Sequence, residues 1–401
     1  MKKKMILNWS IIMATLFSVT VTFAQGVWTA KANFIGSSMV GSVSFVIGTK
    51  LYVGTGANIN TLTNSFWAYD ATTNSWSQIA SFPGVARVGA SSFSIGNYGY
   101  VGLGVGITNV LNDFYRYDPV NDTWTQVSNF VGGAREGATS FSIGSYGYVA
   151  GGYNGSYQND FWQYDPTTDA WTQKSNFSSI GRTEGVGFSI GNMGYFGTGW
   201  HSGSPHSDFW NYDPTINTWT QLSNFPGQPR AQASAFVIGN FAYVGAGQGA
   251  SSVNYSDCFK YNPLSDTWTS VISLPFARHW SIGAAIADSG YIGLGSIFSS
   301  YTNDLSCFVD TNITTNVLGV TQQMFFSAFP NPATGSLYVR VPWNGEYSAT
   351  IRTINGAKVR DILGQGDLCI ERDGLAQGMY ILTVLSPYAI KPESIKIVFT
   401  D

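Results

Sequence analysis

Residues 87–130 hold the stretch that decides the fold. It reads RVGASSFSIGNYGYVGLG over 87–104 and, after a short loop, NDFYRYDPVNDTWTQVSNF over 112–130. Alternation of apolar and polar residues predicts two strands on each side of the loop. An Asn-Tyr-Gly turn joins the first pair, and Asp-Pro-Val-Asn-Asp joins the second pair with Pro at the second turn position. The stretch therefore predicts four antiparallel strands.

The same pattern recurs along the chain at a nearly constant period. A Trp that follows a polar turn appears at Trp28, Trp76, Trp124, Trp171, Trp219 and Trp268, every 47 to 49 residues. Four antiparallel strands in each repeat of this length predict a β-propeller blade. The last unit lacks its Trp strand, and WTAKANF at 28–34 matches the missing one. We therefore expect six blades, with the N-terminal strand closing the last.

Composition agrees with an all-β chain. Of the 401 residues, only 11% are charged, against about 25% in ordinary soluble domains, and 46 are Gly. This scarcity of charge disfavours disorder and helical bundles. The net charge of −3 leaves no general basic surface, so we expect no nucleic-acid partner.

The glycine-rich second strands carry a family resemblance. YVGLG at 100–104, YVAGG at 148–152 and YFGTG at 195–199, each followed by a Tyr-Asp strand end and a spaced Trp, resemble kelch repeats. The paired glycines of that family are kept only as Gly151-Gly152. The resemblance covers roughly residues 27–310 and implies a six-bladed kelch-like propeller over 25–312. In kelch relatives, ligands bind at the face that carries the loops between second and third strands and between blades, here called the loop face.

Two segments flank the repeats. Residues 1–24 join three Lys to an apolar run that ends in Ala24, which predicts a secretory signal peptide, with a membrane anchor as the alternative. Residues 313–325 belong to a polar stretch rich in Thr and Asn, typical of a linker.

Residues 326–401 predict a small immunoglobulin-like β-sandwich, because alternating strands are separated by Gly, Pro and Asn turns. Pro330-Asn331-Pro332, the Asn355-Gly356 turn and Gly374 to Tyr380 resemble the C-terminal sorting domain of the type IX secretion system in the Bacteroidetes. That resemblance implies the secretion machinery as a partner, and a protein that is secreted or attached to the outer-membrane surface. An immunoglobulin-like module without a sorting role is the alternative.

Half of the ten basic residues between 25 and 325 occupy one repeat position, at the start of the first strand: Arg87, Arg135, Arg182, Arg230 and Arg278. They are expected to ring the loop face, where they could bind an anion or a sugar acid. The alternative is an internal ion pair in each blade with the aspartates that begin the third strand: Asp113, Asp160, Asp208, Asp257 and Asp304. Blade one lacks both partners, with Met39 and Ser65 at these positions, which favours pairing.

A few polar and aromatic residues fall outside the repeat pattern. Glu136, Glu184 and His279 follow ring arginines and are the candidates for catalysis, with His201 and His206 in a nearby loop. Solvated loop residues are the alternative for all five. The loops also place aromatic side chains at this face that suit stacking on sugars or packing among themselves: Tyr153, Tyr157, Trp200, Tyr255, Phe298 and Tyr301.

The three Cys and three His are too scattered for a disulfide framework or a metal site. We expect unpaired thiols, with a Cys258–Cys307 bridge as the alternative, no cofactor, no metal and a monomer. The sequence thus predicts a binding protein that recognises a glycan or a protein through its loop face. The alternative is a sugar-active enzyme such as a sialic-acid mutarotase, which is a six-bladed kelch propeller.

Deleting residues 326–401 is expected to leave the protein in the periplasm, because the resemblance assigns outer-membrane translocation to this segment. Immunoblots of periplasmic and extracellular fractions from a host with the type IX system measure this. The full-length chain is the control, and unchanged surface delivery of the truncated chain would contradict the assignment.

Overall fold

A computed structural model describes residues 25–177, 180–298, 300–311, 327–329, 333–341, 346–365, 367–385 and 393–400. Its chain separates into two compact units, Met1–Phe308 and Val309–Asp401. The expected signal peptide, the expected linker over 313–325 and the Pro330-Asn331-Pro332 motif lie outside the described residues.

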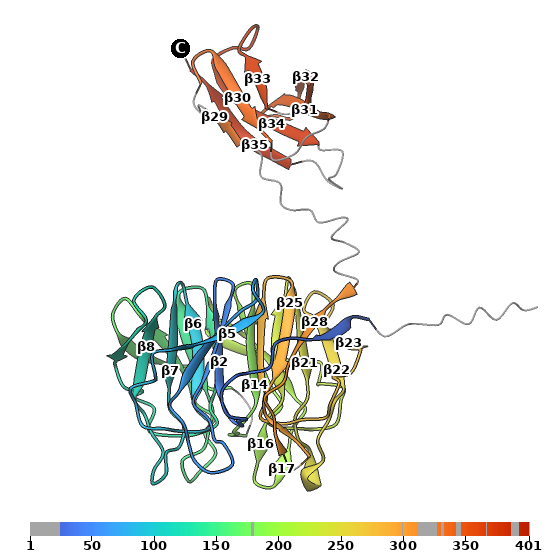
Figure 1. Cartoon of the computed structure of the whole chain (residues 1–401). Helices are drawn as coiled ribbons and strands as arrows, with labels where there is room; N and C mark the ends of the chain where they lie inside the picture. Colours follow the sequence, from blue (N-terminus) through green and yellow to red (C-terminus); the bar gives the residue numbers. More distant parts are fainter. Residues whose placement is uncertain are drawn as a thin grey trace, which may run out of the picture. The chain divides into compact units, whose positions relative to one another are not determined.

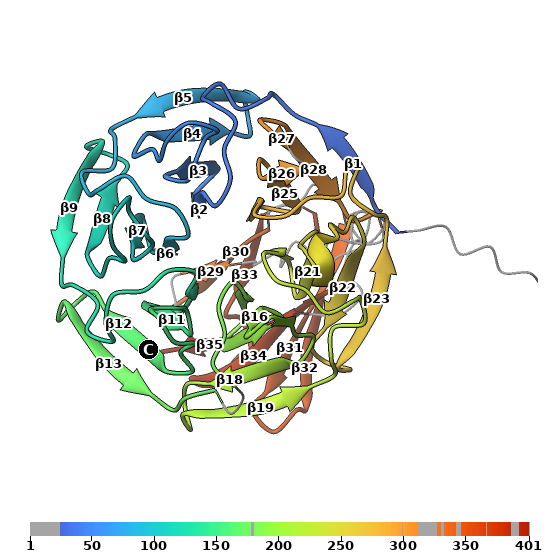
Figure 2. The same ribbon diagram turned by 90° about the horizontal axis from the view of Figure 1, so that it is seen from below.

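The first unit is built of four-stranded antiparallel sheets set around a central axis (Figures 1 and 2). Blade one contains β2 (Val43–Ile47), β3 (Lys50–Gly54), β4 (Phe66–Asp70) and β5 (Ser75–Ile79). Blade two contains β6 (Ser91–Ile95), β7 (Tyr98–Gly102), β8 (Phe114–Asp118) and β9 (Thr123–Val127). Blade three contains β10 (Thr139–Ile143), β11 (Tyr146–Ala150), β12 (Phe161–Asp165) and β13 (Ala170–Lys174).

The remaining blades follow the same order from the axis outward. Blade four contains β14 (Val186–Ile190), β15 (Met193–Gly197), β18 (Phe209–Asp213) and β19 (Thr218–Leu222). Blade five contains β20 (Ser234–Ile238), β21 (Phe241–Gly245), β22 (Cys258–Asn262) and β23 (Thr267–Val271). Blade six contains β24 (Ile282–Ile286), β25 (Ser289–Gly293), β28 (Leu305–Val309) and β1 (Val27–Ala30). The expected six-bladed propeller is confirmed.

The loop face carries three short elements. The hairpin of β16 (Trp200–His201) and β17 (Ser204–Pro205) belongs to blade four, and that of β26 (Ser296–Ile297) and β27 (Ser300–Tyr301) belongs to blade six. A single 3-10 turn, η1 (Ala250–Ser252), lies in blade five. Figure 2 views the propeller from this face.

Adjacent blades pack through aromatic rings that rest on glycine. A Cβ atom at Gly99 of β7 would lie 2.1 Å from the Phe45 ring of blade one, and one at Gly147 of β11 would lie 2.2 Å from the Phe93 ring of blade two. No side chain fits at these positions while the rings stay in place. The glycine at this position of the second strand is therefore a packing requirement in blades two, three, four and six, whereas blades one and five have Leu51 and Ala242 there.

Hydrogen bonds also join each blade to the next through one residue just after the fourth strand. In Ala80, the N–H donates to Asp122 Oδ1 of the next blade (2.9 Å), and the C=O accepts from the Trp124 indole N–H (2.9 Å). We call this arrangement the latch. It repeats at the residues Ala32, Ser128, Ser175 and Ser223, each bound by an Asn or Asp and a Trp.

The seam between blades five and six is closed by the N-terminal strand. β1 pairs with β28 as the outermost strand of blade six. Ile272 takes the latch position there: its C=O accepts from Trp28 Nε1 (3.1 Å), while its N–H donates to the Gln25 carbonyl (3.1 Å) instead of an Asn or Asp side chain. The ring is therefore fastened by residues more than 240 positions apart.

The second unit consists of two antiparallel sheets. One contains β29 (Ser327–Phe329), β30 (Ser336–Arg340) and β33 (Leu368–Glu371), and the other contains β32 (Lys358–Gln365), β31 (Glu346–Thr353), β34 (Gly378–Leu385) and β35 (Glu393–Phe399). Buried Leu337 and Val339 of the first sheet share one core with Ile351, Leu382 and Ile397 of the second. The immunoglobulin-like character of this unit stays a prediction.

Replacing Trp28 with Ala is expected to lower the free energy of unfolding of the propeller by about 3 kcal/mol, because the change removes a latch bond and the ring contacts with Phe236 and Phe308. Urea unfolding followed by near-ultraviolet circular dichroism measures the change. The control Val27→Ala alters the neighbouring exposed side chain of the same strand and should shift stability by less than about 0.5 kcal/mol. Equal losses in the two variants would contradict the closing role.

Candidate functional site

All five ring arginines are paired inside their own blades. Each guanidinium binds its aspartate through both terminal nitrogens, with a shortest N–O distance of 2.5–2.6 Å. One nitrogen also donates to the backbone just after the second strand, as Arg87 does to the Leu103 carbonyl (2.9 Å). The arginine side chains are at most 1% exposed, whereas the aspartates are 16–35% exposed.

This arrangement supports the alternative of internal ion pairs. Both terminal nitrogens of each guanidinium are directed to blade atoms, and the side chains lie below the surface, so we do not assign Arg87, Arg135, Arg182, Arg230 or Arg278 to a ligand. A buried bidentate pair holds two segments of one blade together. The arginine lies in the connection before the first strand, and the aspartate lies at the end of the loop that follows the second strand. Tyr255 also helps to hold Arg230 in place, because its ring lies 4.3 Å from the Arg230 guanidinium carbon.

The residue two positions after each arginine, or after Met39 in blade one, faces the central axis. The six residues at this position form what we call the axial ring: Gly41, Gly89, Gly137, Glu184, Gln232 and Trp280. Each backbone N–H donates to the carbonyl of the equivalent residue in the preceding blade at 2.7–3.2 Å, and the circle closes from Gly41 to Trp280. The axial ring thus fixes six backbones around one channel.

All six axial residues have a left-handed backbone, with φ between 51° and 64°. Glycine takes this conformation at no steric cost, whereas for Glu, Gln and Trp it is strained. Three consecutive blades therefore leave the channel open, and the next three place large side chains in it against a backbone preference. Such strain in a concave site is typical of functional positions.

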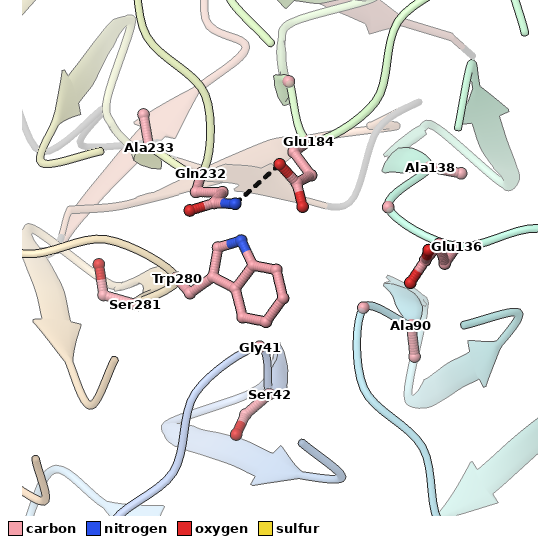
Figure 3. A pocket seen from close by; sticks show the side chains of 13 residues that line it. Gly41, Ser42, Ala90, Glu136, Ala138, Glu184, Gln232, Ala233, Trp280 and Ser281 are labelled. Atoms are coloured by element: carbon pink, nitrogen blue, oxygen red, sulfur yellow. Dashed lines mark hydrogen bonds between the residues drawn. The ribbon is translucent and has the colours of Figure 1, made fainter. Parts of the chain in front are cut away.

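A pocket of about 180 Å³ opens at the axial ring (Figure 3). Trp280, Gln232 and Glu184 gather on one side of it, and Glu136 reaches it from blade three. The Gln232 amide donates to Glu184 Oε2 at 2.8 Å. The Trp280 ring packs over Gly41, where a Cβ would lie 3.1 Å from the ring, so glycine in blade one makes room for the indole.

The two carboxylates of the pocket influence each other. Burial raises the pKa of Glu184, and repulsion from Glu136 raises it further, while hydrogen bonds from Gln232 and Trp280 act in the opposite direction. Burial also raises the pKa of Glu136. The pocket therefore contains acids that hold their protons more strongly than exposed carboxyls do.

The channel continues beyond this pocket into a second cavity of about 200 Å³. Ser44, Ser92 and Ser140 line it in blades one to three, where the axial residues are glycines. The serine hydroxyls donate to the preceding blade, as Ser92 does to the Ser44 carbonyl (2.9 Å). The large side chains of the axial ring all belong to blades four to six.

The other candidates are distributed around the pocket. His279 is the neighbour of Trp280 but is not among the residues that line the pocket, and burial lowers its pKa. Tyr153 exchanges backbone hydrogen bonds with Glu136, and Trp200 does so with Thr183. The structure therefore brings Glu136 and Glu184 together and leaves His279 outside.

His201 and His206 belong to a polar and aromatic cluster at blades three and four. The Tyr157 ring lies 4.9 Å from Tyr153 and 4.7 Å from His201, and His201 Nδ1 lies 2.6 Å from the Gly181 carbonyl oxygen. Burial lowers the pKa of His206, as does the charge of Arg182. Over the described parts of the chain, no group of three or more His, Cys, Asp or Glu is placed to hold a metal ion. Cys258, Cys307 and Cys369 are free thiols.

Sequence reasoning missed Trp280 and Gln232. Aligning the repeats at the residue two after each arginine would have found them, since the position reads Gly, Gly, Gly, Glu, Gln, Trp from blade one to blade six. A search for ionisable groups passes over these two side chains, because they carry no charge.

Comparison with known proteins supports this description. A family model described as the KLHDC2/KLHL20/DRC7 Kelch-repeats domain matches residues 31–184, and one described as the secretion system C-terminal sorting domain matches residues 327–395. The chain is a kelch-repeat propeller with a C-terminal sorting domain. A solved structure titled "Structure of YjhT" is similar to this kelch-repeat chain with a TM-score of 0.62 and 16% sequence identity, over 70% of this chain and 98% of that one. A likeness at this identity shows the fold alone.

No curated protein matches the sequence. The sorting domain indicates type IX secretion of the kelch-repeat protein to the cell surface or the extracellular space. In the portion of the chain that the structure describes, no helix has the length and apolarity needed to cross a membrane.

Replacing Glu184 with Gln is expected to raise the melting temperature at pH 7. The pKa of Glu184 is higher in the folded state than in the unfolded state, so the folded state binds more protons between the two values and loses stability as pH rises through that window. Gln keeps the size of the side chain without the buried charge. The advantage of the variant should therefore shrink as the pH falls towards 4.

Thermal unfolding of both proteins at several pH values measures this difference. Asp288→Asn, in the exposed turn between β24 and β25, is the control and should show no such trend. An advantage of Glu184→Gln that stays constant with pH would contradict the assignment of a buried charge.

Proposed function

We propose that this secreted protein binds a carbohydrate at the axial pocket of its loop face. The observation that carries the proposal is the combination of an indole, two carboxylates and an amide around one small cavity. Carboxylate and amide oxygens accept hydrogen bonds from sugar hydroxyls, and an indole offers an apolar surface to the C–H face of a sugar ring. The pocket is concave and built on a closed backbone ring, so these groups are held in place before a ligand arrives.

The charge of the pocket indicates which sugars suit it. Glu136 and Glu184 are both acidic, and the five ring arginines are bound to aspartates within their blades. An anionic ligand would meet carboxylates without a compensating cation from the ring arginines. We therefore propose a neutral or amino sugar in place of the sugar acid that the sequence suggested.

The size of the pocket favours the end of a glycan over a protein segment. A volume of about 180 Å³ lies below the roughly 300–1,000 Å³ of drug-sized ligand sites. One terminal sugar residue fits this volume, and the rest of the glycan would extend over the loop face.

A sugar-active enzyme is the second candidate, because two carboxyls with raised pKa values share the pocket. Mutarotation of a neutral sugar needs one group that protonates the ring oxygen and another that takes the proton of the anomeric hydroxyl while the ring C–O bond breaks. Glu184 and Glu136 could supply the two roles. A sialic acid is a poorer substrate for this pocket than a neutral sugar, because its own carboxylate would face theirs.

A glycan array probed with the full chain is expected to show binding to glycans that end in a neutral or amino sugar. Trp280→Gly should weaken binding at least about tenfold, since the aromatic surface is lost. The variant introduces the residue that blades one to three have at this position, with a compatible backbone, so the fold should be retained. Glu184→Gln and Glu136→Gln should change the glycan preference.

Phe298→Ala is the control on the same face, because this side chain is 85% exposed and does not line the pocket. Binding that Trp280→Gly leaves unchanged would overturn the proposal. The enzyme candidate is tested by anomer-exchange NMR on neutral sugars, where exchange that Glu184→Gln abolishes would replace binding with catalysis as the function.

A further inference from the structure

Blade one departs from the other five blades at one place. Where they contain a buried arginine and its aspartate, blade one has Met39 and Ser65, and a cavity of about 370 Å³ lies there. Met39, Ser65, Gly36 and Trp67 all border this cavity. It is separate from the axial pocket, and the two have no lining residue in common.

The cavity lies where the guanidinium lies in the other blades. A Cβ atom at Gly84 would be 2.6 Å from Nη2 of Arg87, and one at Gly227 would be 2.5 Å from Nη2 of Arg230. These glycines stand three residues before their arginines. Gly36 stands three residues before Met39 and borders the cavity instead. In the other blades the arginine–aspartate pair fills this space. In blade one no such pair is present, and the cavity remains.

The indole N–H of Trp67 also differs from those of the equivalent tryptophans in blades three and four, which donate to an aspartate. In blades three and four, Trp162 and Trp210 donate their indole N–H to Asp160 and Asp208 at 2.7 Å. Trp67 is the equivalent residue of blade one, and the position of the aspartate is occupied by Ser65. Trp67 packs edge-on against Phe34 (5.6 Å) while it borders the cavity.

Another cavity, of about 420 Å³, adjoins the blade-one cavity. Ser37 and Asn58 border both, and Tyr301 of β27 borders the second one. The two cavities therefore form a continuous depression that runs from blade one towards blade six on the loop face, and each is within the size range of ligand sites.

The side chains around this depression suit a neutral polar ligand. None of the described residues that line either cavity carries a carboxylate, amine, guanidinium or imidazole. A charged ligand would lose hydration without gaining a counter-charge. A purely apolar ligand would cover Ser65, Thr63 and Asn58 without returning their hydrogen bonds.

We propose that the blade-one cavity is a binding site for a neutral sugar residue, with the adjoining cavity taking the next residue of the same glycan. Hydroxyl and amide groups of Ser37, Asn58, Thr63 and Ser65 match sugar hydroxyls as both donors and acceptors. Trp67 supplies an aromatic surface and an indole N–H. This site stands independently of the axial pocket.

The test rebuilds in blade one the pair that the other five blades contain. Met39→Arg with Ser65→Asp in the full chain should fill the cavity with a bidentate ion pair while the fold is retained. The probes are glucose, galactose, mannose and N-acetylglucosamine and their β-linked disaccharides, measured by saturation-transfer NMR and by titration. At least one probe is expected to bind the unaltered chain, and the double variant should weaken it at least about tenfold.

Trp67→Phe is the second variant, because it keeps an aromatic ring against Phe34 and removes the indole N–H; it should weaken the same probe. Phe298→Ala on the same face is the matched control, because this exposed side chain lines neither cavity, and it should leave this binding unchanged. Binding of a probe that the double variant does not weaken, or no binding of any probe, overturns the proposal. Loss of binding in Trp280→Gly alone would assign the sugar to the axial pocket instead.

Discussion

The blades of this propeller are joined through one residue after each fourth strand, and both backbone polar groups of that residue bind to the next blade. At Ala80 these bonds run to Asp122 and Trp124, and equivalent residues repeat them around the ring. A backbone N–H and C=O at a sheet edge would otherwise need water or another partner. Because the partners lie a fixed distance ahead in the chain, the latch requires the nearly constant spacing of the tryptophans. The last seam can be closed only by residues from the other end of the propeller, so the whole ring depends on β1.

The buried Arg–Asp pairs have a further consequence for the loop face. They use half of the propeller's basic residues inside the blades, where a bidentate pair satisfies both charges. The loop face is consequently poor in available cations. Blade one omits the pair without a volume-filling replacement, and a chamber remains beside Trp67. The Arg–Asp pair thus affects both sites, because its presence leaves no ring arginine to balance Glu136 and Glu184, and its absence leaves the blade-one cavity without charged side chains.

The axial ring shows how an asymmetric site arises in a symmetric fold. Six equivalent residues have the same left-handed backbone and the same hydrogen bond to the preceding blade. Variation at this one repeat position therefore changes the contents of the channel without changing the backbone. Glycine in blades one to three leaves space, and that space is occupied in part by Trp280, which packs over Gly41. The pocket is thus a property of all six blades taken together.

The sequence by itself determined the repeat, the blade count and the sorting domain. Local turn chemistry, strand alternation and a fixed period are all visible along one chain. It also indicated the Arg–Asp pairing, because Met39 and Ser65 replace both partners together in blade one. Only the tertiary structure decided that Glu136 and Glu184 share a pocket while His279 lies outside it, and that Trp280 and Gln232 complete that pocket. The physical reason is that residues one or more repeats apart meet around a central axis, where side-chain direction and backbone conformation decide which groups point inward. Alignment of the repeats can mark the axial position, but no local pattern in the sequence shows that its side chains converge on one pocket.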